Sequence, residues 1–190
     1  PAHNTSAYPG RNCAMDKCRG EVITFLDCDD IWIADKLEKQ IQLFIKGADF
    51  IYGKYETIDA NRNRLKTLLQ DKLSGNITNK LFKKSPISIG CVMIKSELIR
   101  QFKFDPFYTI IGDYDLWVRL SLTNNIVFLD SVVEYSRQHG NNISDIEVNR
   151  WLIERRYFYK KYLSVLNIIK YPFLLFYIIK TELLGIFGKR

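Results

Sequence analysis

The chain has 190 residues, and its hydrophobic (47%) and charged (26%) residues occur at the frequencies of an ordinary globular protein, so the length suits one domain with a substantial core. The formal net charge is +7, but residues 151–190 hold eight Lys or Arg against Glu154 and Glu182, which places +6 there. The rest of the chain is nearly balanced, which excludes a basic domain surface for nucleic acid and leaves a basic carboxyl-terminal segment.

The sequence contains four cysteines, namely Cys13, Cys18, Cys28 and Cys91. They form no CxxC pair and have no histidine at the spacing of a zinc site. Scattered cysteines of this kind are typical of small buried residues in a reducing compartment, so we expect a cytoplasmic protein.

The first elements follow a polar, loop-like start. A short helix fits residues 12–18, and the apolar run at 21–27 predicts a buried strand. Residues 32–46 have helical periodicity, and Gly47 is a natural end for that helix. The apolar positions on one face of this helix are Ile33, Leu37, Ile41 and Phe44.

Further along, residues 48–55 alternate as in a strand, and turn residues at 59–63 allow a partner strand after them. The stretch 66–84 is polar and basic with a weak helical pattern. Residues 88–95 predict another buried strand and residues 96–102 a short helix.

The remaining elements are a helix at 113–122, a strand at 126–136 and a helical, apolar and basic stretch from residue 149 onward. Strands that alternate with helices predict a layered α/β domain. We expect a domain over residues 1–148 and a basic helical tail over 149–190.

The motif FLDCDD, residues 25–30, ends the first predicted strand with Asp27, Asp29 and Asp30. Carboxylates in this place face the sheet edge where α/β proteins bind ligands. Two hard oxygen donors there suit Mg²⁺ or Mn²⁺, which can bridge phosphate oxygens. The alternative is that Asp29 or Asp30 caps the next helix, which accounts for one acid well and for three poorly.

The motif GDYDLW, residues 112–117, places Asp113 at the start of a predicted helix among aromatic residues. Partial burial there would raise its proton affinity, as a general base that works near neutral pH requires. The alternative is that Asp113 is a helix cap and Asp115 a solvated acid of the first turn. The local sequence alone favours that alternative.

The motif YSRQHGNNIS, residues 135–144, leads from a strand through Arg137 and His139 into a Gly-Asn-Asn turn. His139 is a candidate ligand for a metal or a phosphate. A lone histidine in a loop is more often an ordinary surface residue.

Taken together, these motifs resemble those of family-2 glycosyltransferases in order and approximate spacing. The matching pieces are Phe25–Gln40, Ser88–Ile94, Asp113–Leu120 and Tyr135–Ser144. The resemblance runs from about residue 10 to residue 144. It implies an α/β GT-A fold, a mixed and mostly parallel sheet with flanking helices.

The resemblance also implies roles for single residues. Asp27 and Asp29 would form the DxD motif that holds Mg²⁺ or Mn²⁺ on the diphosphate of a nucleotide-sugar donor, with His139 as a further metal ligand. Asp113 would be the catalytic base that removes the proton from an acceptor hydroxyl.

The Arg11-Asn12 pair resembles the one that precedes the metal strand in the family, with Arg11 in contact with the nucleotide. The implied reaction transfers a sugar, with inversion, to a hydroxyl of a glycan or lipid-linked acceptor.

The chain departs from the family pattern in two places. Gly112 stands where many relatives have Glu. The first strands of the family's domain, which grip the nucleotide base, have no counterpart before Pro1. We therefore expect an amino-terminally truncated domain whose activity as this chain alone is doubtful.

Two alternatives remain at this stage. A phosphatase of the haloacid dehalogenase type also uses a strand that ends in Asp-x-Asp, but its motif requires Thr or Val where this chain has Ile31. Its later GDxxxD motif fails, because Trp117 and Val118 follow Gly112-Asp113 at the positions required. A catalytically incomplete fragment that binds carbohydrate or a membrane is the second alternative.

The basic tail motivates a separate hypothesis. Residues 171–179 form an apolar run too short to span a bilayer, which takes about 20 residues. Ten of the 26 aromatic residues follow residue 150, among Lys and Arg, which fits a helix that lies at a membrane surface. We therefore expect docking on the cytoplasmic face of a membrane, with a terminal helix packed on the domain as the alternative.

Overall fold

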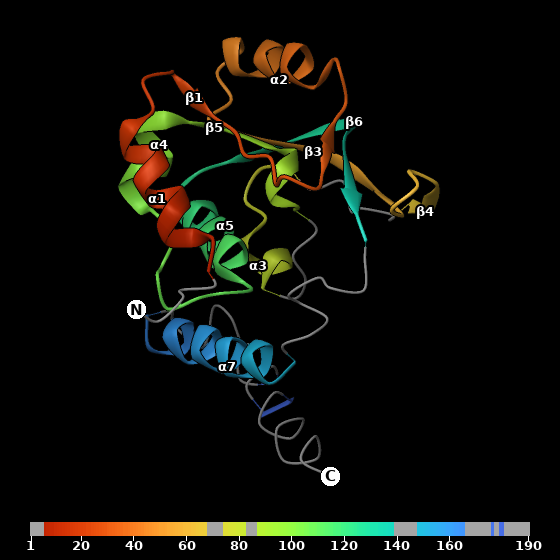
Figure 1. The fold of residues 1–190 in the computed structure, drawn as a ribbon. Coiled ribbons are helices and arrows are strands. Elements are labelled where there is room, and N and C mark those ends of the chain that lie inside the picture. Colours follow the sequence, from red (N-terminus) through yellow and green to blue (C-terminus); the bar gives the residue numbers. More distant parts are fainter. Residues whose placement is uncertain are drawn as a thin grey trace.

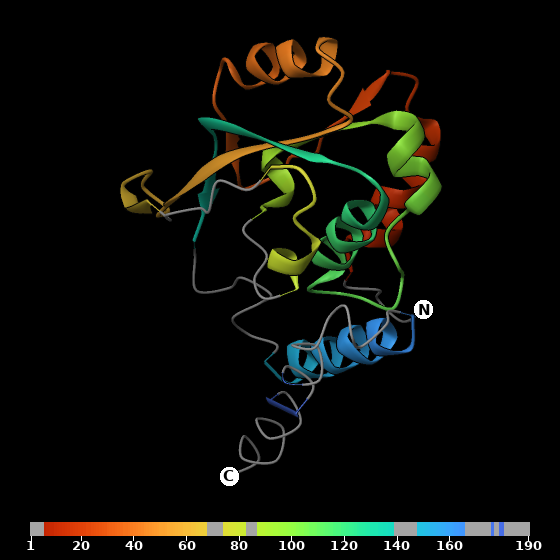
Figure 2. The ribbon, with the colours of Figure 1, turned by 180° about the vertical axis from the view of Figure 1, so that it is seen from behind.

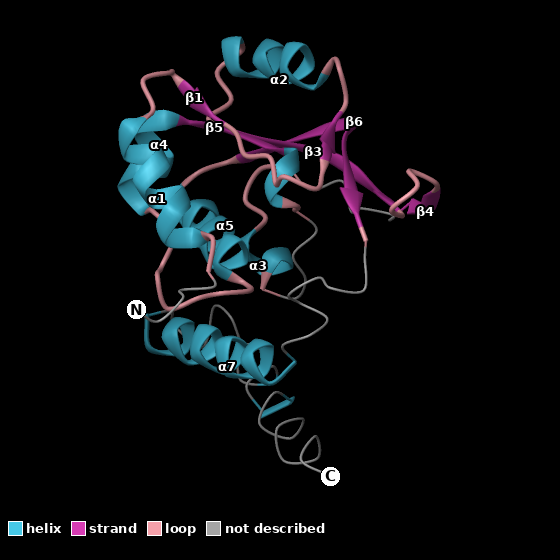
Figure 3. Cartoon of the chain, in the orientation of Figure 1, coloured by secondary structure: helices cyan, strands magenta, loops and turns pink. Residues whose placement is uncertain are grey.

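The computed structural model describes residues 6–67, 74–82, 87–138, 148–165, 176, 179 and 180. A sheet forms the middle layer, with α2 on one face and α1, α3, α4 and α5 on the other, and α7 beyond them (Figures 1–3). In chain order the elements are α1 (Tyr8–Lys17), β1 (Val22–Ile23), β2 (Ile31–Trp32), α2 (Lys36–Ile45), β3 (Phe50–Ile58), β4 (Arg64–Thr67), α3 (Thr78–Leu81), η1 (Ile89–Cys91), β5 (Val92–Lys95), α4 (Ser96–Phe102), α5 (Gly112–Thr123), β6 (Ile126–Arg137) and α7 (Val148–Val165).

The sheet is mixed, as expected, with the strand order β1-β5-β3-β6-β2 and with β4 beside β3. The expectation of a mostly parallel sheet is wrong for these strands. Only β3 and β6 pair in parallel, whereas β1–β5, β3–β5, β3–β4 and β2–β6 are antiparallel. The reason lies in the connections. A parallel pair needs a long crossover, which the helices between β3 and β6 supply, whereas the turn at 59–63 folds β4 directly back on β3.

The strand β3 is the centre of the sheet, and its first residues Phe50, Ile51 and Tyr52 are fully buried. Both faces are covered at this point, so the alternation predicted for residues 48–55 does not produce an exposed face. A side chain at Gly53 would place its Cβ 2.7 Å from a methyl group of Val133 on β6, which explains why the chain has glycine there. The β3–β6 register shifts next to this close contact.

The buried strand predicted at 21–27 pairs only over β1. Beyond Ile23, side chains replace the backbone ladder. The Thr24 hydroxyl donates to the Val92 carbonyl at 2.5 Å, and the Lys36 ammonium lies 2.8 Å from Thr24 Oγ1 and 3.2 Å from the same carbonyl. These bonds hold Thr24 beside β5 after the backbone pairing has ended.

The helix α2 begins four residues later than predicted, because Ile31 and Trp32 pair with β6. Its buried face is also different from the predicted apolar one. Lys36 and Gln40 are fully buried, whereas Leu37 is 46% exposed. The polar face is buried because its groups are satisfied: Lys36 Nζ donates to Gln40 Oε1 (2.7 Å), and Gln40 Nε2 donates to the Cys91 carbonyl (2.8 Å).

Three other predictions are right only in part. The helix predicted at 12–18 begins at residue 8, the strand predicted at 88–95 begins as a 3-10 helix before β5, and the weakly helical stretch 66–84 holds the end of β4 and the short α3.

The later predictions agree closely with the structure. Helix α4 has the predicted bounds, and α5 and β6 differ from the predictions by one residue at their ends. Leu116, Trp117 and Leu120 of α5 are fully buried against the sheet. Of the four cysteines, Cys91 is buried as expected, while the other three are exposed.

Helix α7 is part of the core. Phe158 and Tyr159 are fully buried, and Tyr162 is 2% exposed. The buried Glu154 carboxylate accepts hydrogen bonds from the backbone N–H groups of residues 109, 110 and 111, at 2.6, 2.9 and 3.0 Å. Residues 149–165 therefore pack on the domain, and the boundary predicted at residue 148 does not separate them from it. Among the helices that the structure describes, none is long and apolar enough to cross a membrane.

Candidate active site

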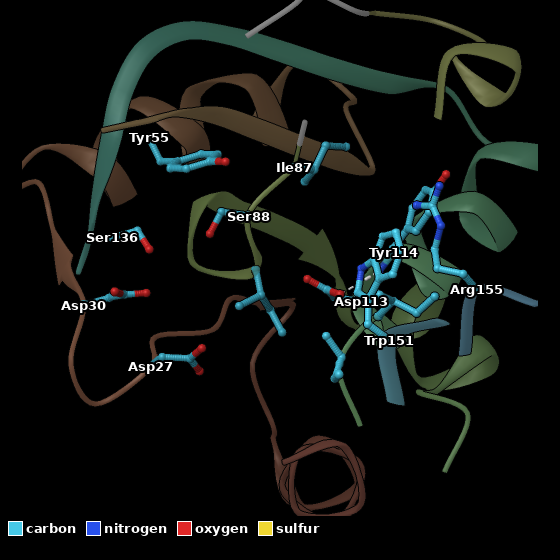
Figure 4. Close-up of a pocket in the computed structure, with 13 residues that line it drawn as sticks. Asp27, Asp30, Tyr55, Ile87, Ser88, Asp113, Tyr114, Ser136, Trp151 and Arg155 are labelled. Atoms are coloured by element: carbon cyan, nitrogen blue, oxygen red, sulfur yellow. Dashed lines mark hydrogen bonds between the residues drawn. The ribbon is translucent and has the colours of Figure 1, made fainter. Parts of the chain in front are cut away.

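A cavity of about 560 Å³ opens between the carboxyl end of the β1 segment, the end of β6 and the first turns of α5 and α7 (Figure 4). Its walls combine acids, hydroxyls and aromatic rings. The lining residues are Asp27, Asp30, Tyr55, Ile87, Ser88, Ile89, Ile110, Ile111, Asp113, Tyr114, Ser136, Trp151 and Arg155. The acids stand at two separate places: Asp27 and Asp30 on one side, and Asp113 on the other.

The loop that carries the first acids is fixed to the end of β6. The Asp30 N–H donates to the Asp27 carbonyl at 3.1 Å, which makes a tight turn. Arg137 holds this turn from the other side: its N–H donates to Asp30 Oδ1 (2.8 Å), and its Nε donates to the Asp29 carbonyl (2.9 Å). The turn is thus positioned by a strand more than 100 residues away in the sequence.

Asp27 forms an ion pair with Arg11 of α1, and 40% of its side chain is exposed. Asp29 does not line the cavity, and it is half-buried. The helix α2 has no side-chain cap, so the alternative in which one of these acids caps it is wrong. Two of these acids contact residues outside α2 instead: Asp27 pairs with Arg11, and Asp30 accepts the Arg137 N–H.

Asn12 does not line the cavity, and its side chain makes a structural contact instead. Its Nδ2 donates to the Phe104 carbonyl and its Oδ1 accepts from the Phe104 N–H, both at 2.8 Å. This reciprocal pair joins α1 to the loop after α4. His139 lies outside the described residues, so its predicted role as a metal ligand stays a prediction.

Asp113 lies in the first turn of α5 and faces the cavity. The Tyr114 N–H donates to its Oδ1 at 2.8 Å, and the Tyr8 hydroxyl lies 3.3 Å from the same oxygen. Burial raises the pKa of the Asp113 carboxyl to about 6, and the hydrogen bond from Tyr114 and the charge of Arg11 oppose that rise. A carboxyl with this pKa is ionised at neutral pH and still holds a proton well enough to act as a general base.

Gly112 is explained by the neighbouring ring of Tyr8. A Cβ at position 112 would lie 2.5 Å from that ring. The Tyr8 hydroxyl donates to the Ile110 carbonyl (2.8 Å) and so fixes the ring against the start of α5. Tyr8 thus occupies the space that a side chain at position 112 would need.

Asp115 is not the solvated acid that the sequence suggested as an alternative. Its carboxylate is fully buried and accepts from Arg119 Nε (2.7 Å) and Lys161 Nζ (3.0 Å). The hydroxyls of Tyr108 and Tyr162 each lie 3.2 Å from its Oδ1. Asp115 therefore joins α5 to α7, and Asp113 is the acid of this pair that is open to a ligand.

Sequence reasoning missed three features of this site. Burial raises the pKa of Glu134 to about 8, and the negative charge of Asp30 adds to that rise, so an uncharged carboxyl lies behind the acidic turn at neutral pH. Trp151 and Arg155 reach the cavity from α7, inside the segment interpreted as a tail. Glu134 could have been noticed as an acid within an apolar strand, whereas nothing local in the sequence shows where α7 packs.

Comparison with known proteins decides the family. The sequence model of glycosyl transferase family 2 matches residues 2–103, more than half of the chain. The chain belongs to glycosyl transferase family 2. This assignment confirms the resemblance of the motifs and decides against a phosphatase of the haloacid dehalogenase type.

Several curated proteins are similar to this family-2 chain. The Escherichia coli protein WfgD, a UDP-Glc:alpha-D-GlcNAc-diphosphoundecaprenol beta-1,3-glucosyltransferase, is 40% identical over 121 residues, which cover 63% of this chain and 46% of WfgD. An uncharacterized glycosyltransferase of Methanocaldococcus jannaschii is 31% identical over 119 residues, 61% of this chain and 41% of that protein. The chain spans about half the length, or less, of these relatives.

The solved structure of S. aureus TarS 1-349 in complex with UDP superposes with a TM-score of 0.66 at 16% identity, over 93% of this chain and 51% of TarS. This similarity shows the fold, a GT-A fold with a mixed sheet and flanking helices. In this family-2 chain, the turn with Asp27 and Asp30 and the start of α5 with Asp113 lie at one cavity of that fold.

Proposed function

We propose that the cavity is the active site of a glycosyltransferase that moves a sugar, with inversion, from a nucleotide-diphosphate donor to a hydroxyl of a glycan or lipid-linked acceptor. The observation that carries the proposal is the arrangement of acids in one cavity of a family-2 chain: an acidic turn on one side and an acid with a pKa of about 6 on the other.

The acidic turn is the proposed donor side. The sequence predicts Asp27 and Asp29 as the metal pair, and both carboxylates offer the hard oxygen donors that Mg²⁺ and Mn²⁺ prefer. Asp30 suits this role less, because it accepts the Arg137 N–H and because burial raises its pKa. Among the described residues no group of three or more acids, histidines or cysteines could hold a metal, so phosphate oxygens of the donor and His139 are the proposed additional ligands.

When bound, the metal would neutralise charge on the leaving diphosphate. The protein's own groups do the rest on this side. Arg11 is the proposed cationic contact to the nucleotide, because its ion pair with Asp27 puts a guanidinium beside the turn that we assign to the donor diphosphate. The bonds from Arg137 keep the turn in one position, so that little ordering is needed when the donor binds.

The start of α5 is the proposed acceptor side. Asp113, ionised at neutral pH, removes the proton from the acceptor hydroxyl as that oxygen attacks the sugar. The hydrogen bond from the Tyr114 N–H and the contact with Tyr8 fix the carboxylate toward the cavity. Attack from the side opposite to the leaving diphosphate inverts the configuration at the anomeric carbon.

The name of WfgD supports a lipid-linked acceptor, because it describes a protein that acts on a sugar diphosphate attached to a polyprenol. We propose an acceptor of the same class, and with it a role in polysaccharide assembly at the cell envelope. Docking of residues 166–190 on the cytoplasmic face of a membrane would keep the enzyme close to such a substrate.

A hydrolysis assay on the full-length gene product tests the proposal. A panel of sugar nucleotides is incubated with Mn²⁺ or with a chelator, and release of the nucleoside diphosphate is measured. We expect metal-dependent release from at least one donor, and loss of it in the Asp27→Asn and Asp29→Asn variants. Donor binding without turnover of any donor, with or without an acceptor, would favour the incomplete binding module instead.

A further inference from the structure

The acceptor side of the cavity includes two residues of α7 that the proposed reaction does not yet use. Trp151 and Arg155 are four residues apart, so they lie on the same side of the helix, and both line the cavity. Figure 4 shows them beside Asp113 and Tyr114, across the cavity from Asp27 and Asp30.

Arg155 is surrounded by aromatic rings. Its guanidinium carbon lies 4.9 Å from the ring centre of Trp151, 5.1 Å from that of Tyr159 and 5.6 Å from that of Tyr114. Its Nη2 donates to the Tyr159 hydroxyl at 2.5 Å, while its Nε is buried and has no hydrogen-bond partner within the described part of the chain. These rings stabilise a cation only partly.

Other cations of this layer have carboxylate partners. Arg119 and Lys161 pair with Asp115, and Arg150 pairs with Glu154. No Asp or Glu lies within ion-pair distance of Arg155 among the residues that the structure describes. A partly desolvated cation that lines a cavity without an anion favours an anionic ligand, because the anion compensates its charge.

The position of Arg155 indicates which anion this is. The diphosphate of the donor belongs with the acidic turn, on the far side of Asp113 from Arg155. An anion at Arg155 would therefore belong to the molecule whose hydroxyl Asp113 deprotonates. Phosphate and diphosphate groups match the planar fork of a guanidinium, and the indole of Trp151 offers an apolar wall for a sugar ring.

We propose that Trp151 and Arg155 form an acceptor subsite for a sugar that carries a phosphate or diphosphate group, with the ring against Trp151 and the anion at Arg155. This inference rests on the proposed function, since it assigns the Asp113 side of the cavity to the acceptor.

Calorimetric titration of the full-length protein tests the subsite. The charged probe is N-acetylglucosaminyl diphosphate with a short alkyl chain, and the uncharged probe is the alkyl glycoside of the same sugar. We expect the wild-type protein to bind the charged probe at least about tenfold more tightly, as one charge-assisted bidentate contact would give. Arg155→Gln should remove that preference, Arg155→Lys should keep part of it, and Trp151→Ala should weaken both probes.

UDP affinity with Mn²⁺ and thermal melting serve as controls for the donor side and for folding. Lys160→Gln also removes one positive charge from α7, but at an exposed position, and should leave the affinity for both probes unchanged. The subsite proposal is overturned if the Arg155→Gln variant still prefers the charged probe. It is also overturned if this variant loses as much affinity for UDP as for the charged probe, since Arg155 would then bind the anion of the donor. Failure of the proposed function would differ: the preference for the charged probe would stand, but no sugar would be transferred to it.

Discussion

The substitution Asp113→Asn should abolish transfer and, at the same time, stabilise the fold. The burial that raises the pKa of Asp113 from 3.8 to about 6 makes ionisation of this carboxyl unfavourable in the folded state. Because the folded chain holds the proton more tightly than the unfolded chain, the stability linked to it is complete below pH of about 4 and is lost as the pH rises through about 6. An amide at this position never ionises and avoids that loss.

The magnitude follows from the shift of about two pKa units. Each unit corresponds to about 1.36 kcal/mol, so ionisation of Asp113 lowers the free energy of unfolding of the wild-type protein by at most about 3 kcal/mol at pH 8 and by about half of that at pH 5. The half-buried position of Asp113 at the cavity wall reduces this, so we expect Asp113→Asn to raise the free energy of unfolding by about 1–3 kcal/mol at pH 8. The amide oxygen can still accept the Tyr114 N–H.

Urea denaturation at pH 5 and pH 8 measures this gain, and a transfer assay measures the accompanying loss, about 10²–10⁴-fold for a positioned base. Asp115→Asn is the matched control. It leaves Arg119 and Lys161 without their buried carboxylate, and removal of one partner from a buried ion pair costs about 3–5 kcal/mol. We therefore expect the free energy of unfolding to rise in Asp113→Asn and to fall in Asp115→Asn. A destabilised Asp113→Asn, or one that keeps transfer within about tenfold of wild type, would refute the reasoning.

Three further predictions concern the site, α7 and the tail. The kcat/KM for transfer should fall below pH of about 6 with the slope of one proton, because Asp113 must be ionised to act as a base; a profile that is flat from pH 5 to 8 would contradict this. Glu154→Gln places an NH₂ group against backbone donors and should lower the free energy of unfolding by about 2–4 kcal/mol, whereas Glu97→Gln, whose side chain is 84% exposed, should change it by less than about 0.5 kcal/mol in the same urea titration. The intact protein should float with anionic vesicles at low salt and less at high salt, whereas a variant with Gln at Lys170, Lys180, Lys189 and Arg190 should stay in the soluble fraction; equal flotation of both would contradict docking through the tail.

Much of the site could be predicted because its acids are local signals. Asp27 follows an apolar run and Asp113 begins a periodic helix, so each could be placed at an element end from neighbouring residues alone. Their presence at one cavity depends on tertiary packing, but the order of the motifs in a known family indicated it. The family resemblance already indicated Asp113 as the base, but the role of Asp115 needed the structure, because only packing by α7 shows that Asp115 is buried in ion pairs.

The predictions that are wrong have a common physical cause. Polar side chains can be buried when distant residues satisfy their hydrogen bonds, and the spacing of hydrophobic residues along the sequence does not show this. The apolar face predicted for α2 is wrong because Lys36 and Gln40 are satisfied by Thr24 and by the Cys91 carbonyl. Residues 149–165 were interpreted as a tail because their charge and aromatic content also suit a membrane surface. In the folded chain the rings of Phe158, Tyr159 and Tyr162 are in the core, and Glu154 binds a backbone turn some 44 residues earlier.

The position of a bound metal tests the central claim most directly. Crystals of the full-length protein grown with UDP and Mn²⁺ would give an anomalous signal at the wavelength of the manganese edge. We predict one peak between the diphosphate and the carboxylates of Asp27 and Asp29, on the far side of the cavity from Asp113. A nucleotide and metal bound elsewhere, with this turn still closed by the Arg11–Asp27 ion pair, would contradict the assignment of the cavity as the donor site.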